Sequence, residues 1–243
     1  MLKFIENPHL PQGNVRSLII GEKYANQLEL PLKQHEITVK SLRNNTFSDI
    51  KLCGHADLSI IHLGNNKIAT YDIFFTISGA NIIRLSTPAS PDYPYDAGLN
   101  VCILGEYLIC NPGVIDTDLL KLIGQKRILK VKQGYTKCSI CVVNENSIIT
   151  DDAGIHKAAV NANIDSLLIS KGIVALNGFN YGFIGGASFK ISKSKLAFTG
   201  IIPDSRLRTE IESFLADRNI EAVYLTDNNI YDIGGAIPIT EEI

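Results

Sequence analysis

The sequence lacks any apolar run that approaches the roughly 20 residues a helix needs to span a bilayer. Its opening, residues 1–13, also lacks the long apolar stretch of a signal peptide. We therefore expect no membrane association and, by default, a cytoplasmic location.

The chain also lacks a charge excess of either sign, because 23 Lys and Arg face 25 Asp and Glu, a formal net charge of −2. The basic residues are scattered rather than clustered, which gives no reason to expect a nucleic-acid partner. No low-complexity tract, linker or composition shift divides the 243 residues, of which 45% are hydrophobic. We expect a single domain over residues 1–243, with a large core.

Cysteines are few and odd in number, and most lie in strand-like segments. This pattern favours buried, reduced thiols over a disulfide framework. Two of them form a C-x-x-C, but residues three apart on an extended strand project to opposite faces, which disfavours a metal clamp or a redox pair. A redox or metal protein is thus the weakest interpretation, and we expect no metal and no cofactor. The five are Cys53, Cys102, Cys110, Cys138 and Cys141.

One pattern can be laid down five times along the chain: a strand, a turn, a second strand, a helix and a third strand. Four copies are continuous, and in the first of them the segment 73–79 occupies the place of the helix. The fifth is split, with one strand from 232–239 and the rest from the N-terminal region. Such a unit cannot bury its apolar faces alone, so a repeat architecture follows. The continuous copies span residues 54–86, 95–132, 135–170 and 182–226.

Hairpin turns inside each unit require antiparallel pairs, which a doubly wound parallel sheet lacks. We therefore predict an α/β fold of five small mixed sheets around an axis, closed into a ring by its two terminal segments. The first strand of each unit would line the centre and the helices would cover the outside. Between two units, the three prolines of 86–96 predict a loop.

Local signals support this arrangement. The segment 206–219 places its apolar residues on one helical face, and Asp204 or Ser205 precedes it as an N-cap. Asp151 and Asp152 also stand where a helix begins, so capping is their expected role. Glycine pairs at 185–186 and 234–235 predict either bulges or strands that pass close to other backbone or a ligand.

The sequence GHADLS predicts a polar strand face. On an extended strand His55, Asp57 and Ser59 would share one side, opposite Ala56 and Leu58. A central strand in a ring has little bulk solvent to face, so this polar side favours a site. The alternative is a structural histidine beside an aspartate that caps a turn.

The sequence GYTKC, residues 134–138, places Cys138 in the corresponding strand of its own unit. It could therefore face the same axis as His55 and Asp57. The alternative is a buried cysteine that acts as a small hydrophobe.

With these motifs the chain resembles the penteins, the fivefold αβ-propellers of arginine deiminases, dimethylarginine hydrolases, agmatine deiminases and amidinotransferases. The resemblance covers the whole chain as architecture, and its motifs are GHADL and GYTKC. It implies that Cys138, four residues after a glycine, is a nucleophile. It also implies that His55 is an acid/base and that Asp57 binds a cationic substrate. The chain also looks like an uncharacterised bacterial group within that fold.

The chain departs from the pentein motifs that hold a guanidinium. The glycine pair in FIGGASF has no acid beside it, whereas Asp232 stands two residues before the other pair. Asp96 lies in YPYDAG without a neighbouring arginine, and Asn100 would share its face on an extended strand. We predict Asp96, Asn100 and Asp232 as further substrate-binding residues.

Together these observations predict a thiol-dependent hydrolase or transferase that acts on a small guanidine or amidine in a central channel. The alternative is a non-catalytic pentein that binds a small ligand or a protein. The sequence leaves the substrate and the oligomeric state open.

Overall fold

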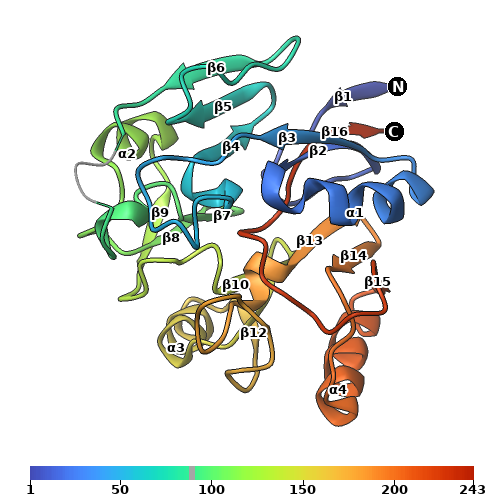
Figure 1. Cartoon of the computed structure of the whole chain (residues 1–243). Coiled ribbons are helices and arrows are strands. Elements are labelled where there is room, and N and C mark those ends of the chain that lie inside the picture. The colour runs from blue at the N-terminus through green and yellow to red at the C-terminus, as the bar shows by residue number, and fades with distance from the viewer. Residues whose placement is uncertain (88–90) are drawn as a thin grey trace.

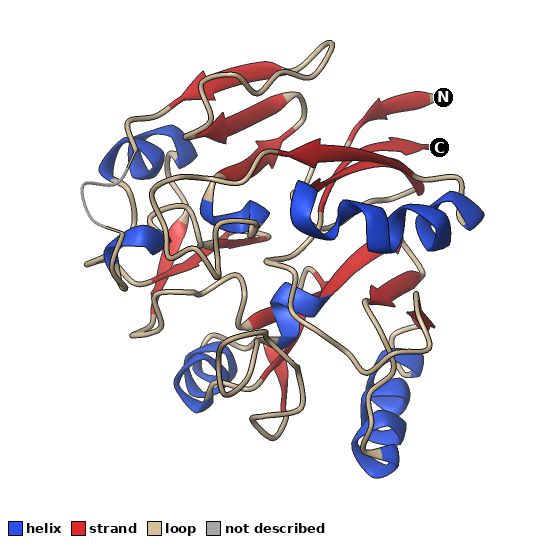
Figure 2. Cartoon of the chain, in the orientation of Figure 1, coloured by secondary structure: helices blue, strands red, loops and turns tan. Residues whose placement is uncertain are grey.

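A computed structural model describes residues 1–87 and 91–243 as an α/β fold of mixed sheets, which confirms the predicted class. Several small sheets are visible, with helices packed beside them (Figures 1 and 2). Of the predicted loop 86–96, residues 88–90 lie outside the described residues. No helix in the described part of the chain combines the length and apolarity of a membrane span.

Three sheets have three strands each and share one pattern of pairing. The first strand pairs antiparallel with the second through a hairpin, and the second pairs parallel with the third. The strands are β4 (Ile60–Gly64), β5 (Lys67–Thr70) and β6 (Asn81–Arg84); β7 (Cys102–Leu104), β8 (Tyr107–Cys110) and β9 (Arg127–Lys130); and β10 (Ile140–Asn144), β11 (Ser147–Thr150) and β12 (Asp165–Leu168).

A larger sheet contains the same pattern twice, in β13-β14-β15 and in β16-β2-β3, with β1 at its edge. The two ends of the chain therefore share one sheet, as expected for the split unit. A single bridge from Ser192 to Asn14 links the two sets. The strands are β1 (Leu2–Phe4), β2 (Asn14–Gly21), β3 (Thr38–Leu42), β13 (Ser188–Ser192), β14 (Lys195–Phe198), β15 (Glu221–Tyr224) and β16 (Ile237–Glu242).

The helices are α1 (Glu22–Gln34), α2 (Thr117–Ile123), α3 (Ala153–Asn161) and α4 (Ser205–Ala216). Helix α4 buries Leu207, Ile211 and Leu215, and the Asp204 side chain caps it by accepting two backbone N–H groups. This confirms the predicted apolar face and cap.

Two other predictions about helices are corrected. Asp152 caps α3, whereas Asp151 caps nothing and is buried. Segment 73–79 forms turns instead of a helix. It is short and rich in β-branched residues, so it cannot offset the cost of helix nucleation.

The predicted strand starts are also wrong, because three short 3₁₀ helices and a turn precede the first strands. They are η1 (Ala56–Leu58), η2 (Tyr95–Ala97), η3 (Ile184–Ala187) and the turn at 136–139. Side-chain alternation along an extended strand therefore does not apply to GHADLS, YDAGLN or GYTKC. Chain reversal and tertiary contacts place these side chains instead.

The five cysteines are free and buried, as predicted. Cys141 lies on β10 in an apolar cluster with Val143 and Ile149. Cys138 lies outside that strand, in the turn before it. The two sulfurs of the C-x-x-C thus belong to different environments.

Candidate functional site

His55 stands immediately before η1, and only 3% of it is exposed. Its backbone N–H donates to the Leu52 carbonyl. The loop after Asp232 passes so close that a Cβ on Gly234 would lie 2.3 Å from the Cβ of His55, and Gly234 has a φ of +68°. The second glycine pair is therefore a close approach, in a conformation that other residues rarely adopt.

Cys138 is fixed from several sides in its turn. Its backbone N–H donates to Asn100 Oδ1 at 3.0 Å, and Asn100 Nδ2 donates to its Sγ at 3.4 Å. Its carbonyl accepts the Gly186 N–H at 2.9 Å. Asn100 therefore positions Cys138. The prediction that Asn100 shares a strand face with Asp96 is wrong, because residues 95–97 form a 3₁₀ helix.

Asp232 is a buried carboxylate held by backbone donors. Its Oδ1 accepts the Gly234 N–H at 2.8 Å, and its Oδ2 accepts the Phe183 N–H at 2.9 Å. A Cβ on Gly186 would lie 2.0 Å from Asp232 Oδ1. Each glycine pair thus leaves room for a side chain of this cluster.

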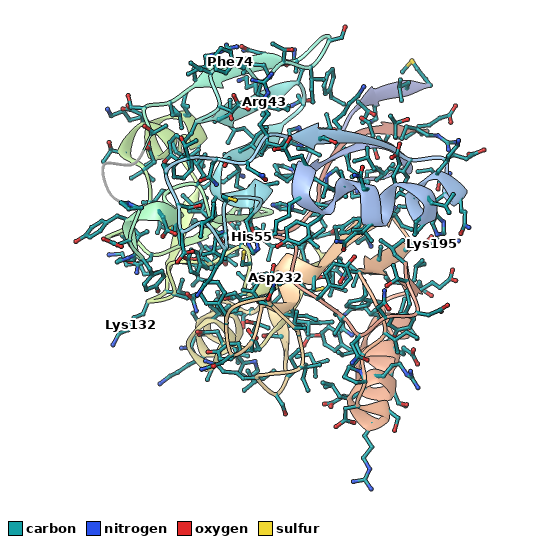
Figure 3. All side chains as sticks on the ribbon, in the orientation of Figure 1. Arg43, His55, Phe74, Lys132, Lys195 and Asp232 are labelled. Atoms are coloured by element: carbon teal, nitrogen blue, oxygen red, sulfur yellow. The ribbon has the colours of Figure 1, made fainter. Side chains whose placement is uncertain are left out.

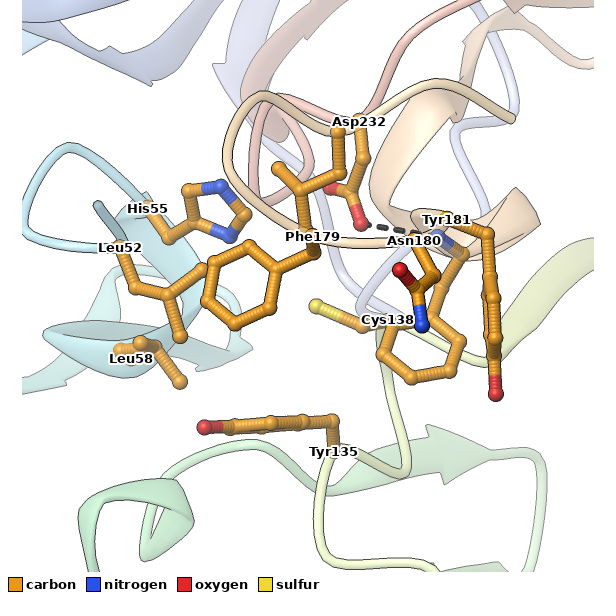
Figure 4. A pocket seen from close by; sticks show the side chains of 11 residues that line it. Leu52, His55, Leu58, Tyr135, Cys138, Phe179, Asn180, Tyr181 and Asp232 are labelled. Carbon is orange, nitrogen blue, oxygen red and sulfur yellow. Dashed lines mark hydrogen bonds between the residues drawn. The ribbon is translucent and has the colours of Figure 1, made fainter. Parts of the chain in front are cut away.

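The three side chains converge. Donor atoms of His55, Cys138 and Asp232 all lie within 4.8 Å of one another. They line a pocket of about 260 Å³, whose other walls are mainly aromatic and aliphatic (Figure 4). His55 and Asp232 lie next to each other near the middle of the molecule (Figure 3). The arrangement offers a soft nucleophile, a base and a negative charge around one small space.

Asp57 lies against the sulfur rather than among the residues that line this pocket. Cys138 Sγ donates to Asp57 Oδ2 at 2.6 Å. Burial raises the pKa of Asp57 to about 7, and the hydrogen bond from Cys138 opposes that rise. Burial, followed by the charge of Asp57, raises the pKa of the Cys138 thiol well above its ordinary value. The resting sulfur is thus a thiol.

His55 is neutral at pH 7, because burial lowers its pKa while Asp232 opposes the change only in part. Tyr24 contributes a hydroxyl 3.5 Å from His55 Nε2 and an edge contact between the rings. A neutral imidazole can accept a proton, as a general base must.

Asp96 lies behind a wall of the pocket. Its Oδ2 accepts the Tyr135 hydroxyl at 2.8 Å, and it is itself 1% exposed. Tyr135 lines the pocket and Asp96 does not. Asp96 was predicted to contact a substrate, but in this structure it instead holds the Tyr135 hydroxyl.

The trio of His55, Cys138 and Asp232 carries the donor types that a metal ion can bind. A cysteine ligand must be a thiolate, however, and this sulfur donates its proton to Asp57. Metal binding by the trio would therefore require Cys138 to lose that proton. The C-x-x-C offers no alternative, since Cys141 lies in the core.

Sequence reasoning missed the loop between β12 and η3, which supplies much of the pocket wall. Leu176, Phe179, Asn180 and Tyr181 come from it, and Phe183 follows. The signal was present as GFNYGF at 178–183, a run of aromatic residues between glycines in a loop. Loop aromatics that are not needed for a core are candidates for ligand contacts.

A second cavity of about 500 Å³ adjoins the first. The two share Asp232 and three residues of the loop, so they are neighbours. Lys23 and Gln27 of α1, Asn177 and Tyr231 line the second cavity.

Several solved structures resemble this fold. An agmatine deiminase of C. jejuni aligns over 92% of this chain and 89% of its own, with 10% identity and a TM-score of 0.52. The inosamine-phosphate amidinotransferase of Streptomyces griseus aligns over 98% and 96%, with 10% identity and a TM-score of 0.56. An amidinotransferase from Microseira wollei in saxitoxin biosynthesis aligns over 90% and 91%, with 9% identity and a TM-score of 0.58.

These similarities confirm the resemblance to the penteins at the level of the fold. At such identities they leave the activity open. No curated protein matches the sequence. A family model matches residues 19–237, and the chain therefore belongs to that family, which is described as a family of unknown function (DUF6873).

Proposed function

We propose that this protein is a cysteine-dependent hydrolase or transferase that acts on a small guanidine or amidine. One observation carries the proposal: a thiol, a neutral imidazole and a carboxylate meet within 4.8 Å at one pocket. The pentein enzymes with the same fold include an agmatine deiminase and amidinotransferases.

The pocket suits a flat cation. Asp232 uses its two oxygens to accept backbone N–H groups, and each oxygen keeps a further lone pair for a substrate nitrogen. Tyr135, Phe179 and Phe183 provide aromatic surfaces on which an amidinium can stack. An apolar, buried surrounding strengthens the ion pair with Asp232.

The reaction would proceed through a covalent intermediate. Cys138 Sγ forms a bond to the amidinium carbon, and an amine leaves with one added proton. In a hydrolase, neutral His55 then takes a proton from a water molecule, whose oxygen attacks the carbon and displaces the sulfur. In a transferase, an acceptor amine takes the place of that water.

The substrate would extend from Cys138 into the second cavity. The ammonium of Lys23 contacts the carbonyl of Lys51, at 3.2 Å, and the ring of Tyr24. Gln27 and Asn177 add neutral donors nearby. Asp232 also lines this cavity, but in the proposed complex it pairs with the guanidinium. Lys23 then favours an acidic tail over a second cationic group, so a guanidino acid fits the space better than a guanidino amine.

We further propose that the sheets form a five-bladed propeller, closed where β16 pairs with β2. Five sets of strands with the same order of antiparallel and parallel pairs support it. The segments before the first strands of four units carry His55, Asp96, Cys138 and the glycine pair of η3. A cytoplasmic location would keep the thiols reduced.

Two reagents of the same size test the proposal. 2-Chloroacetamidine is a cation and 2-chloroacetamide is neutral, and both alkylate thiols. We expect the amidine to modify Cys138 preferentially, by at least about tenfold beyond its advantage on a free thiol, because Asp232 attracts the cation. Peptide mass spectrometry locates the modification. The preference should disappear in Asp232→Asn and persist in Asp96→Asn.

Turnover is measured separately, as amine or ammonia released from a panel of guanidino acids and amidines. Release that Cys138→Ser abolishes supports the enzyme. Cation-selective labelling without release would instead favour the non-catalytic alternative, a pentein that only binds a small ligand. Absence of both selectivity and release would overturn the proposal.

A further inference from the structure

The Asp57 carboxylate has two different sides. Its Oδ2 accepts the proton of the Cys138 thiol at 2.6 Å. Its Oδ1 is buried and has no hydrogen-bond partner in the described part of the chain. A buried carboxylate oxygen without a partner costs free energy, so its retention calls for an explanation.

Asp57 also lines a separate, small cavity of about 10 Å³, to which Cys138 does not contribute. That volume is close to what one water molecule requires. The polar residues around the cavity besides Asp57 are His9, His62 and Lys137. His9 Nε2 and His62 Nδ1 also lack partners among the described residues.

Lys137 is the charged group on this side. It is 8% exposed, and its ammonium donates to the carbonyls of Ile140 and Gly185, at 3.5 and 3.2 Å. Burial lowers the pKa of His9, and the charge of Lys137 lowers it further. Burial also lowers the pKa of His62. Both imidazoles are therefore neutral at pH 7. Lys137 is the buried cation whose charge stabilises the ionised form of Asp57.

We infer that Asp57 is the base that takes the proton of Cys138, and that Lys137 stabilises the negative charge of this pair from behind. The S–H bond breaks, its proton goes to Asp57 Oδ2, and the electron pair left on sulfur forms the bond to the substrate carbon. That proton then passes from Asp57 to the leaving nitrogen as the carbon–nitrogen bond breaks, so the step balances. The catalytic part of this inference rests on the proposed function.

Geometry favours Asp57 over His55 for this step. Asp57 Oδ2 lies in direct hydrogen-bond contact with the sulfur, whereas the His55 ring belongs to a cluster whose donor atoms are spread over up to 4.8 Å. His55 faces the open pocket, where a water molecule can reach it. The two bases thus divide the reaction: Asp57 serves the thiol, and His55 serves the incoming water.

Both charge and proton affinity fit this role. The pKa of Asp57, raised to about 7 by burial, lies near the range in which a general base works best. Asp232 adds to that rise and Lys137 opposes it. Without Lys137 the pair would hold a buried negative charge with no nearby cation behind it.

The test is the rate of Cys138 alkylation by neutral iodoacetamide between pH 5 and 11, followed by mass spectrometry of the peptide. In wild-type protein the alkylation rate should rise in a step near the pH at which Asp57 ionises, because Asp57 and Cys138 then share one proton. Asp57→Asn should lose this step and react at least about tenfold more slowly at pH 7.5. His55→Gln should stay within about twofold of wild type, while any turnover falls.

If Asp57 is not the base, the same variant should give the opposite change in alkylation rate. If Asp57 only repels a thiolate, Asp57→Asn removes a negative charge and Cys138 reacts faster at pH 7.5. That result, or loss of the step in His55→Gln, overturns the inference.

Lys137 provides a second comparison. Lys137→Met should move the step to higher pH and slow alkylation severalfold at pH 7.5, whereas Lys137→Arg should preserve the profile. If the step in the alkylation profile stays at the same pH in Lys137→Met, Lys137 does not stabilise the negative charge of the Asp57–Cys138 pair. Thermal unfolding shows whether each variant folds, and if Lys137→Met does not, Asp57→Asn still decides the identity of the base. Since iodoacetamide requires no substrate binding, the result is independent of whether guanidines are turned over.

Discussion

The front and the back of the Cys138 sulfur differ in size, polarity and access. In front lies a pocket of about 260 Å³ that adjoins a second cavity and contains His55 and Asp232. Behind lies a cavity of about 10 Å³ that contains Asp57 and Lys137. The front can admit a substrate, whereas the back can admit about one water molecule.

This difference separates two tasks. Under the proposed function, residues in front would determine what binds, because they line the pocket beside the sulfur. Residues behind would determine how the sulfur holds its proton, because they line a cavity with Asp57 and do not line the front pocket. Substitutions on the two sides should therefore change different measurements, and the following experiments probe that division.

The largest effect is expected for Asp232→Asn. It removes the carboxylate that lines the pocket, and so should lower kcat/KM for a guanidino substrate by at least about 10³-fold, or roughly 4 kcal/mol. Asp96→Asn is the matched control, since Asp96 is equally buried but lies behind Tyr135. Steady-state kinetics of both variants, with unfolding curves, make the comparison. An equal loss in both would mean that the front has no special role in binding.

The sequence predicted strands, hairpins and helix faces well because their periodicity is local. Residue 204 capped α4 and the terminal segments paired, as expected. The turns before the first strands were missed because tertiary contacts decide them. His55, for example, is placed by the close passage of Gly234, a residue 179 positions away in the chain.

Several predicted site residues do converge on Cys138. Asp57 and Asn100 hydrogen-bond to it, whereas Asp96 hydrogen-bonds to Tyr135. Strand alternation predicted one shared face for His55 and Asp57 and another for Asp96 and Asn100. Neither face exists, because both segments contain 3₁₀ helices instead of extended strands. Lys137 could not be distinguished from a surface lysine, because nothing in its neighbours signals burial.

The second prediction concerns stability and the back of the site. The folded-state pKa of Asp57, about 7, exceeds the ordinary value of 3.8. Between these values the folded protein holds a proton that the unfolded chain has lost, so stability decreases as pH rises. Its contribution is full below about pH 4 and is lost through about pH 7. About three pKa units correspond to roughly 4 kcal/mol as an upper limit.

Asp57→Asn should therefore flatten the pH dependence of the unfolding free energy between pH 4 and 7, by about 3 kcal/mol. Denaturant unfolding at several pH values measures it. Asp151→Asn is the control, because burial raises the pKa of Asp151 to about 6 at a position outside the site. It should flatten the curve less and leave Cys138 alkylation unchanged. An unchanged slope in Asp57→Asn would show that its carboxylate is ionised throughout.

The smallest effect is expected at the far end of the front cavity, where Lys23 would meet the tail of a substrate. Two compounds of equal length separate the possibilities: 4-guanidinobutyrate ends in a carboxylate and agmatine ends in an ammonium. Wild-type protein should favour the acid, and Lys23→Gln should reduce that preference about fivefold, or roughly 1 kcal/mol, as expected of an exposed ion pair. Lys33→Gln, at the other end of α1, should leave it unchanged. The ratio of kcat/KM values, or of protection against alkylation, measures the preference. Because an exposed ion pair is screened, the effect of Lys23 should also shrink as salt is added, whereas the effect of Asp232 should persist. A preference for agmatine would place the tail away from Lys23 and restrict the front site to the sulfur, the imidazole and Asp232.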